Sequence, residues 1–379
     1  PVSILTNILV SYLSGAAVIL GFISLLLASW AAILAPLVLY PAGFLIELIL
    51  LIVRWVQILP GAFIWVAAPP VWSIILYFTA LLTGLAALRN QQYRKYLIPS
   101  LGTIAVFFVI LLIPAGFYHR GYLELDFIDV GQGDAILLKT PQGKFMLIDG
   151  GGNSLYDVGK TTLLPYLHRR GIRELCILLN SHPDEDHLLG LMAVAEELPV
   201  KYIALPASLA NCPEYEPLQR IAGQDRVSTL HLRAGQKLEL EKGLDISILH
   251  PGGQNFNKNN NNNQSVVLKV SYKEFSAWLT GDIEEEAMQG LLDAGVITAA
   301  TLVKVPHHGS KNSLLVEFYR QVQPRYAIIS VGSNNLYGHP HPAILTMLNE
   351  QNSKILRTDQ DEAVIVRSNG HTVTINTTL

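Results

Sequence analysis

Two histidines and three carboxylates lie within one short segment, Ser181-His182-Pro183-Asp184-Glu185-Asp186-His187. Imidazoles and carboxylates at this density repel and desolvate one another unless a cation compensates them. The segment therefore predicts a divalent metal site. The alternative, a solvated acidic turn, accounts for the carboxylates but not for the flanking histidines.

The residues on either side of this segment predict where it sits in a fold. Residues 175–180 form a short, uniformly apolar run, which is typical of a strand buried on both faces. From Leu188 onward the apolar residues follow a helical spacing. The segment is therefore expected on a strand-to-helix loop, where α/β sheets usually carry their chemistry.

Other polar residues follow predicted strands in the same way. They are Asp149, His250, Asp282, His307, His308, His339 and His341, and seven of the 11 histidines fall at such places or in the first segment. Strands that end on one edge of a sheet would gather these side chains into one cleft, with ligands suited to Zn, Mn or Fe. A plain turn explains Asp149 equally well on its own, and loop structure explains His250 and the His339/His341 pair equally well.

The composition divides the chain into two parts. Charged residues make up only 15% of the sequence, and the mean hydropathy is +0.33, which indicates a membrane part. Residues 1–120 hold one acid and five bases, whereas the remainder holds 29 acids and 22 bases, a net charge of −7. We therefore predict membrane-spanning helices over 1–120 and a globular domain over 121–379. Because the sequence starts at Pro1 in apolar text, we expect a C-terminal piece of a longer membrane protein; a signal peptide is the alternative.

Four apolar stretches are long enough to cross a bilayer: residues 4–34, 36–53, 71–88 and 97–117. The proline-broken, tryptophan-rich text from Arg54 to Trp72 suits an interfacial or re-entrant segment better. The loop from Arg89 to Lys95 is the most basic of this half, so the positive-inside rule puts it in the cytoplasm. The globular domain would then lie on the outer face of the cytoplasmic membrane, although His119 and Arg120 argue mildly against this orientation.

The globular part alternates strands and helices in an α+β pattern. Strands are expected at 123–130, 135–139 and 145–148 as a meander, then at 201–205, 265–271, 275–279, 301–305 and 325–331. Residues 235–250 resemble another antiparallel pair, and the run from Asn255 to Asn263 is a low-complexity loop. Helices are expected at 160–170 and 284–294, and the tail reads as strands at 363–367 and 372–376.

The combined motifs carry a resemblance to a known family. LIDGG, HPDEDH, TGD and PHHGS together resemble the metallo-β-lactamase superfamily, whose fold is an αββα sandwich with a one- or two-metal site between its sheets. DVGQGDAILLKTP, the Asn-rich stretch before Ser265, and YGHPHP make it similar to ComEC-type competence channels. There, a membrane domain imports single-stranded DNA and some members append this domain. The whole set is specific, although each piece alone would be weak.

This resemblance implies a role for each matching position. His182 matches the first histidine of the HxHxDH signature, and Asp186-His187 match its final pair. Asp184 stands where most members have the second histidine.

The other ligands come from later motifs. Asp282 matches the bridging aspartate, and His307 or His308 the last histidine ligand. The remaining histidine has no clear match: His250 comes nearest by order, and the Asn262/Asn263 region is the alternative. Zn and Mn are both plausible cofactors, as one or two ions.

The implied chemistry is phosphodiester hydrolysis. A metal-bound hydroxide would attack phosphorus, Asp186 would orient it, and Asp149 would hold a ligand histidine. The leaving oxygen needs a proton donor, for which His308 and His339 are available, with His341 as a further residue near the site.

Three hypotheses follow from the resemblance. In the first, the domain is a nuclease that degrades the DNA strand that is not imported, with the membrane, DNA and other uptake proteins as partners. The net charge of −7 argues against it, because nucleic-acid binders are usually basic. In the second, the domain binds DNA or gates the channel without catalysis, which Asp184 and the missing histidine favour. In the third, the substrate is another phosphodiester.

Overall fold

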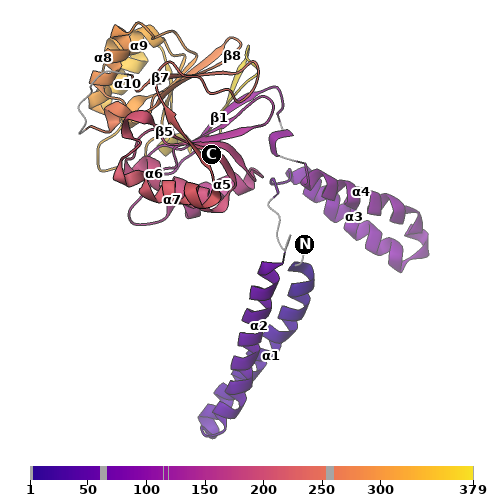
Figure 1. Cartoon of the computed structure of the whole chain (residues 1–379). Helices are drawn as coiled ribbons and strands as arrows, with labels where there is room; N and C mark the ends of the chain where they lie inside the picture. The colour runs from indigo at the N-terminus through magenta and orange to yellow at the C-terminus, as the bar shows by residue number, and fades with distance from the viewer. Residues whose placement is uncertain (1–2, 60–65, 114, 118, 253–259, 379) are drawn as a thin grey trace. The chain divides into compact units, whose positions relative to one another are not determined.

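The computed structural model describes residues 3–59, 66–113, 115–117, 119–252 and 260–378. The chain divides into two compact units, Pro1–Trp65 and Val66–Leu379, which are treated separately. Figure 1 shows a helical hairpin in the first unit, and a second hairpin and a two-sheet domain in the other.

The structure forms a helix over each of the four apolar stretches. The helices are α1 (Ser3–Trp30), α2 (Ala35–Ile58), α3 (Val71–Arg89) and α4 (Leu97–Leu111), and α1 packs on α2 as α3 packs on α4. All four helical stretches are long and apolar enough to cross a membrane, counting α4 together with the turn before it (Gln91–Leu111). The interfacial segment predicted from Arg54 to Trp72 begins differently in the structure. Its first residues belong to the apolar helix α2, which continues past Arg54 to Ile58. Its middle, residues 60–65, lies outside the described residues.

Two sheets form the frame of the globular domain. The eight-stranded sheet has the order β14-β13-β1-β2-β3-β4-β5-β6, and the six-stranded sheet has the order β12-β11-β10-β9-β8-β7. The strands of the first sheet are β1 (Leu123–Phe127), β2 (Ile136–Lys139), β3 (Phe145–Ile148), β4 (Leu175–Leu179), β5 (Val200–Pro206), β6 (Ser228–Leu232), β13 (Val364–Ser368) and β14 (Val373–Thr377). Those of the second are β7 (Asp245–His250), β8 (Val267–Tyr272), β9 (Phe275–Leu279), β10 (Leu302–Lys304), β11 (Tyr326–Ile329) and β12 (Lys354–Arg357).

The two sheets face each other across one apolar layer. Alternate residues of each strand point inward, so that Leu125 and Ile177 of the first sheet share a core with Leu268 and Ile328 of the second. The outer faces carry separate apolar clusters. The helices that cover them are α5 (Leu164–Arg169), α6 (Glu185–Glu197) and α7 (Glu216–Asp225) on one side, and α8 (Glu285–Asp293), α9 (Val316–Val322) and α10 (Pro342–Glu350) on the other. The predicted αββα sandwich is confirmed.

The strand pairing explains the sequence pattern around the first metal-site segment. β4 lies between β3 and β5 and is parallel to both. Parallel strands are usually covered on both faces of their sheet, which explains why β4 is apolar throughout. The predicted meander of β1, β2 and β3 is antiparallel, as expected. Residues 235–250 differ from the prediction: β7 pairs with β8, and only an isolated bridge joins Lys237 to Ser247. Residues 253–259 of the Asn-rich run lie outside the described part of the chain.

Candidate metal centre

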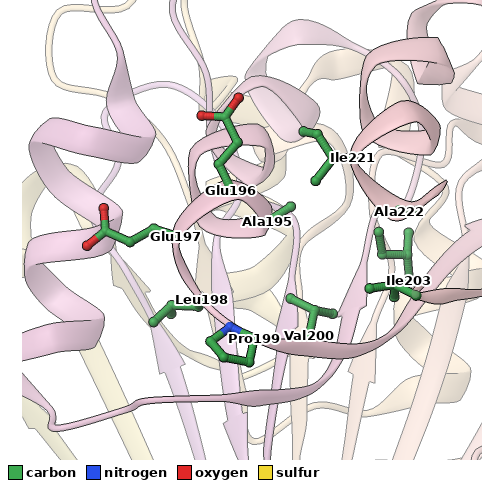
Figure 2. Close-up of a pocket in the computed structure, with 10 residues that line it drawn as sticks. Ala195, Glu196, Glu197, Leu198, Pro199, Val200, Ile203, Ile221 and Ala222 are labelled. Atoms are coloured by element: carbon green, nitrogen blue, oxygen red, sulfur yellow. The ribbon is translucent and has the colours of Figure 1, made fainter. Parts of the chain in front are cut away.

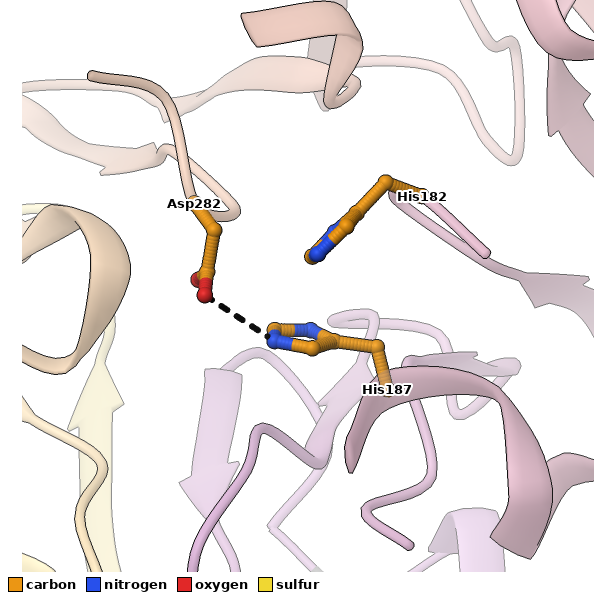
Figure 3. Close-up of side chains that lie close together, drawn as sticks. All are labelled: His182, His187 and Asp282. Carbon is orange, nitrogen blue, oxygen red and sulfur yellow. Dashed lines mark ion pairs between the residues drawn. The ribbon is translucent and has the colours of Figure 1, made fainter. Parts of the chain in front are cut away.

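The candidate site lies where loops from both sheets meet. Asp149 follows β3, the segment from His182 to His187 links β4 to α6, Asp282 follows β9, and His308 follows β10. Figure 3 shows His182 from the loop after β4, His187 from the first turn of α6 and Asp282 from the loop after β9, all pointing toward one point. Each of these residues is a sequence-predicted ligand, and the folding of two separate sheets brings them together.

His187 is the centre of the cluster. Its Nε2 lies 3.2 Å from Asp282 Oδ2, and its Nδ1 lies 3.0 Å from Asp149 Oδ2. Asp149 also accepts hydrogen bonds from the Ser181 backbone N–H (2.7 Å) and the Asn180 side-chain amide (3.0 Å). Because these donors fix the carboxylate, Asp149 fixes the ring of His187 in turn.

His308 completes the cluster from the second sheet. Its Nε2 lies 3.1 Å from Asp282 Oδ2 and 3.3 Å from Asp186 Oδ2. His307 and His308 both have positive φ angles, 48° and 53°. A left-handed backbone costs roughly 1–3 kcal/mol at a non-glycine residue and is concentrated at functional sites. Here it turns two successive rings toward different partners.

His182 lies beside His187, and Asp184 lies beside His182. The rings of His182 and His187 have centroids 4.2 Å apart, and His182 Nε2 lies 3.6 Å from Asp184 Oδ2. The side-chain amide of Asn261 donates to Asp184 Oδ1 at 3.1 Å. Burial would raise the pKa of Asp184, but hydrogen bonds from His182 and Asn261 outweigh it and lower that pKa. The aspartate therefore occupies this position as an anion.

The three clustered histidines present the same nitrogen to the centre. An acceptor engages each Nδ1: the Ser181 hydroxyl for His182 (3.0 Å), Asp149 for His187, and the Ser330 carbonyl for His308 (2.8 Å). An N–H at Nδ1 leaves the Nε2 lone pair free for a metal. All three Nε2 atoms are buried and make no hydrogen bond of good geometry among the described residues.

These atoms fit a divalent cation. His182, His187 and Asp282 bring ligand atoms within 4.8 Å of one another, as do Asp186, His187 and His308. Burial lowers the pKa of His308, but Asp282 and Asp186 outweigh it and raise that pKa to about 10. Excess negative charge thus draws protons onto the rings of His187 and His308, and a cation would balance the same charge. Imidazole and carboxylate ligands suit Zn, Mn and Fe.

Two residues that the sequence analysis did not assign also belong to the cluster. Lys304, at the end of β10, is fully buried; it forms an ion pair with Asp134 and lies 3.1 Å from Asp282 Oδ1. Asp134 lies 3.8 Å from His187 Nδ1 and 3.6 Å from His308 Nδ1. Lysine is almost never fully buried without a partner. A lysine within the apolar run TLVKV therefore indicates a buried ion pair from the sequence alone.

The other predicted site residues lie around this cluster rather than in it. His250 Nε2 lies 2.9 Å from the Asn263 backbone oxygen, and the Asn263 amide group contacts Glu284 and Glu286. His307 Nδ1 lies 3.2 Å from Glu284 Oε1. His339 faces the ring of His307, with centroids 5.7 Å apart.

His341 has a structural role in the same region. Its Nδ1 accepts a hydrogen bond from Ala343 N at 3.2 Å and caps α10.

The surface also has a hollow away from the cluster. A cavity of about 370 Å³ lies between α6, β5 and α7, with Ile203 and Ile221 among its lining (Figure 2). The lining includes Glu196 and Glu197 but no histidine, and both carboxylates are drawn on the α6 side. It therefore lacks the imidazole ligands of the metal centre.

Comparisons with known proteins match the two parts of the chain to different family models. Residues 128–333 match the model described as metallo-beta-lactamase superfamily, and residues 1–91 match the model described as competence protein. The chain is 31% identical over 317 residues to ComE operon protein 3 of Bacillus subtilis (80% of this chain, 40% of the relative). It is 32% identical over 275 residues to Recombination protein 2 of Haemophilus influenzae (72% of this chain, 32% of the relative). The chain thus spans well under half the length of these relatives.

Solved structures show lower similarity. CmlA, a diiron β-hydroxylase from Streptomyces venezuelae, has a TM-score of 0.42 and 14% identity to this chain. The match covers 65% of this chain and 54% of CmlA.

Proposed function

Because the chain belongs to the metallo-β-lactamase superfamily and its first 91 residues match the competence-protein family, we propose that its globular domain is a metal-dependent nuclease of a membrane DNA-uptake protein. The substrate proposed is the DNA strand that is not imported.

One observation carries the proposal. Asp186, His187, Asp282 and His308 direct carboxylate oxygens and free Nε2 atoms at one buried point. Asp282 Oδ2 lies within 3.2 Å of the Nε2 atoms of His187 and His308, so this carboxylate would hold a metal together with both rings. A divalent metal held there would polarise a water molecule and neutralise charge on phosphoryl oxygens.

The chain's own side chains would perform the remaining tasks. The Asp186 side chain is about one third exposed and its Oδ2 lies 3.3 Å from His308 Nε2, so it can orient an attacking water. Asp149 and Ser330 hold His187 and His308 in position. His339, beside His307 and partly exposed, is the residue proposed to act on the leaving oxygen. Burial, His308 and His307 lower the pKa of His339 to about 4, so near pH 7 its neutral ring would donate an N–H hydrogen bond to that oxygen. Because His308 Nε2 faces two carboxylates, we assign it as a ligand instead.

The surroundings of His182 and His250 support an alternative function without catalysis. Asp184 stands beside His182, and the Nε2 atom of His250 contacts the Asn263 backbone oxygen. A centre with fewer histidines could bind metal without cleaving DNA, as a gating or binding module. Hydrolysis of another phosphodiester is a further alternative, since the fold does not fix the substrate.

We also propose where the domain acts. By the positive-inside rule, the basic loop from Arg89 to Lys95 would lie in the cytoplasm. The apolar stretch after this loop would then cross outward and put the globular domain on the outer face of the cytoplasmic membrane, where duplex DNA arrives. Other uptake proteins would deliver the DNA there.

A cleavage assay tests the proposal. The full chain in lipid nanodiscs would be loaded with Mn²⁺ or Zn²⁺ and given end-labelled single- and double-stranded DNA. We expect metal-dependent cleavage that falls by at least about 100-fold in the Asp186→Ala/His187→Ala variant. His371→Ala, a change at an exposed histidine, is the matched control. Bound metal without any cleavage by the wild type would overturn the nuclease proposal and favour gating.

A further inference from the structure

Exposed apolar side chains of the globular domain gather in two loops. The described residues 122–378 expose eight large apolar side chains, and four of them lie in these loops. Leu155 (90% exposed) and Tyr156 (48%) lie between β3 and α5, and Leu336 (100%) and Tyr337 (71%) lie between β11 and α10. We call these four residues the apolar rim.

Both loops lie against the β1–β2 loop that carries Asp134. The Tyr156 hydroxyl lies 3.6 Å from the position that a Cβ would take on Gly131. On the other side, the Gly332 N–H donates to the Gln132 side chain at 3.3 Å, and Asn335 donates to the Gly332 carbonyl at 3.0 Å. The two halves of the rim therefore flank one loop of the metal centre.

Tyr337 is connected to the metal centre through a series of rings. It stacks on His339 with centroids 5.8 Å apart and planes 18° apart. His339 lies 5.7 Å from His307, whose ring is 6.1 Å from that of His308. The outer face of Tyr337 is thus an exposed aromatic surface a few ring widths from the cluster.

The charge of the domain indicates what this surface could bind. Proteins that bind nucleic acid through phosphates carry basic surfaces, but residues 121–379 have a net charge of −7. Binding of a polyanion to this domain would then need an interaction that does not depend on charge. Base stacking on aromatic side chains provides about 1–3 kcal/mol per base and tolerates any sequence.

We propose that the apolar rim, with Tyr337 as its main stacking surface, binds unpaired nucleobases next to the phosphodiester at the metal centre. A duplex buries its base faces in its own stack, so the occupant is a single strand or a frayed end. This inference rests on the proposed function, because it specifies the form of that substrate.

The test separates bases from backbone. A labelled 12-nucleotide single strand and an abasic strand of equal length would be titrated into the full chain in nanodiscs, with EDTA present so that neither is cut. We expect wild type to prefer the strand with bases, and Tyr337→Ala to lose roughly tenfold in affinity for it. Tyr337→Phe keeps an aromatic ring and should bind as wild type does.

A matched control removes an exposed tyrosine elsewhere. Tyr122 precedes β1 and so lies at the opposite end of this strand from the β1–β2 loop; Tyr122→Ala should retain the preference. Equal binding of both strands by wild type, or equal affinity of Tyr337→Ala and Tyr122→Ala, would overturn the inference. Because binding is measured without metal, a preference for bases in a chain that cuts no DNA would refute the nuclease proposal alone.

Discussion

The Lys304 ammonium nitrogen lies 3.1 Å from Asp282 Oδ1, on the side of that carboxylate opposite to the histidines. Asp282 Oδ2 faces His187 and His308, so one aspartate joins a buried lysine to the metal centre. Burial would lower the pKa of Lys304, but Asp134 and Asp282 outweigh it and raise that pKa. The lysine is therefore a fixed positive charge between the two carboxylates.

Lys304→Met should destabilise the protein strongly. The change leaves Asp134 and Asp282 buried without their cation, and removal of one partner from a buried ion pair costs about 3–5 kcal/mol. Urea denaturation of the full chain in detergent would measure the loss. Lys160→Met, at an exposed lysine paired with Asp157, should change the free energy of unfolding by less than about 0.5 kcal/mol. Equal stabilities of the two variants would show that the buried pair contributes little.

Asp149→Asn should weaken metal binding. An amide in this position turns a donor toward Ser181 or His187, so the ring of His187 loses its fixed orientation. Residues that orient a ligand typically contribute 10- to 100-fold in metal affinity. Titration calorimetry with Mn²⁺ or Zn²⁺ would measure the change, with Asp157→Asn as an exposed control. Unchanged affinity in Asp149→Asn would mean that His187 is held by other contacts.

Gly133→Ala should disturb the site through the backbone. Gly133 has a φ of +122°, and a Cβ there would lie 2.1 Å from the Asp186 carbonyl oxygen. We expect a loss of about 1–3 kcal/mol in stability together with a lower metal content. Gly223→Ala is the matched control, because nothing lies within 4 Å of its Cβ position in α7, and alanine should add up to about 1 kcal/mol there. A stable Gly133→Ala variant with full metal would contradict the close packing of this loop on Asp186.

The sequence predicted most of the centre because its residues follow strand ends. His182, Asp186, His187, Asp282 and His308 all lie together, as the motifs indicated. His250 also ends a strand, but this strand, β7, is at the edge of its sheet, one strand beyond β8. The order of strands depends on contacts between distant segments, which no local pattern reveals.

The buried charges were harder to predict for a similar reason. Asp134 lies within a recognised motif, yet its partner Lys304 is 170 residues away along the chain. The pairing depends on the two sheets facing each other, since Asp134 lies in the β1–β2 loop of the first sheet and Lys304 ends a strand of the second. A lysine in an apolar run indicates a buried partner without identifying it.

His250 should make stability fall in acid. Burial lowers the pKa of His250 to about 4, against about 6.5 in the unfolded chain. Between these values the unfolded state binds a proton that the native state does not, so stability is lost as pH falls from 6.5 toward 4. At pH 4.5 the loss should be about 2 kcal/mol relative to pH 7.

His250→Gln removes this titration and keeps a donor for the Asn263 carbonyl. Its free energy of unfolding should depend less on pH between 7 and 4.5 than that of wild type, and its metal content should be unchanged. A wild-type slope in the variant would assign the acid sensitivity to other groups. Loss of bound metal would make His250 a ligand.

The position of the metal tests the central claim most directly. Crystals of the full chain soaked in Mn²⁺ or Zn²⁺ would be measured at the absorption edge of the metal, for wild type and for Asp186→Ala/His187→Ala. We predict an anomalous peak between His187 Nε2, His308 Nε2 and the carboxylates of Asp186 and Asp282, and no such peak in the variant. Absence of a peak there in wild type, or a peak at His250 instead, would contradict the account.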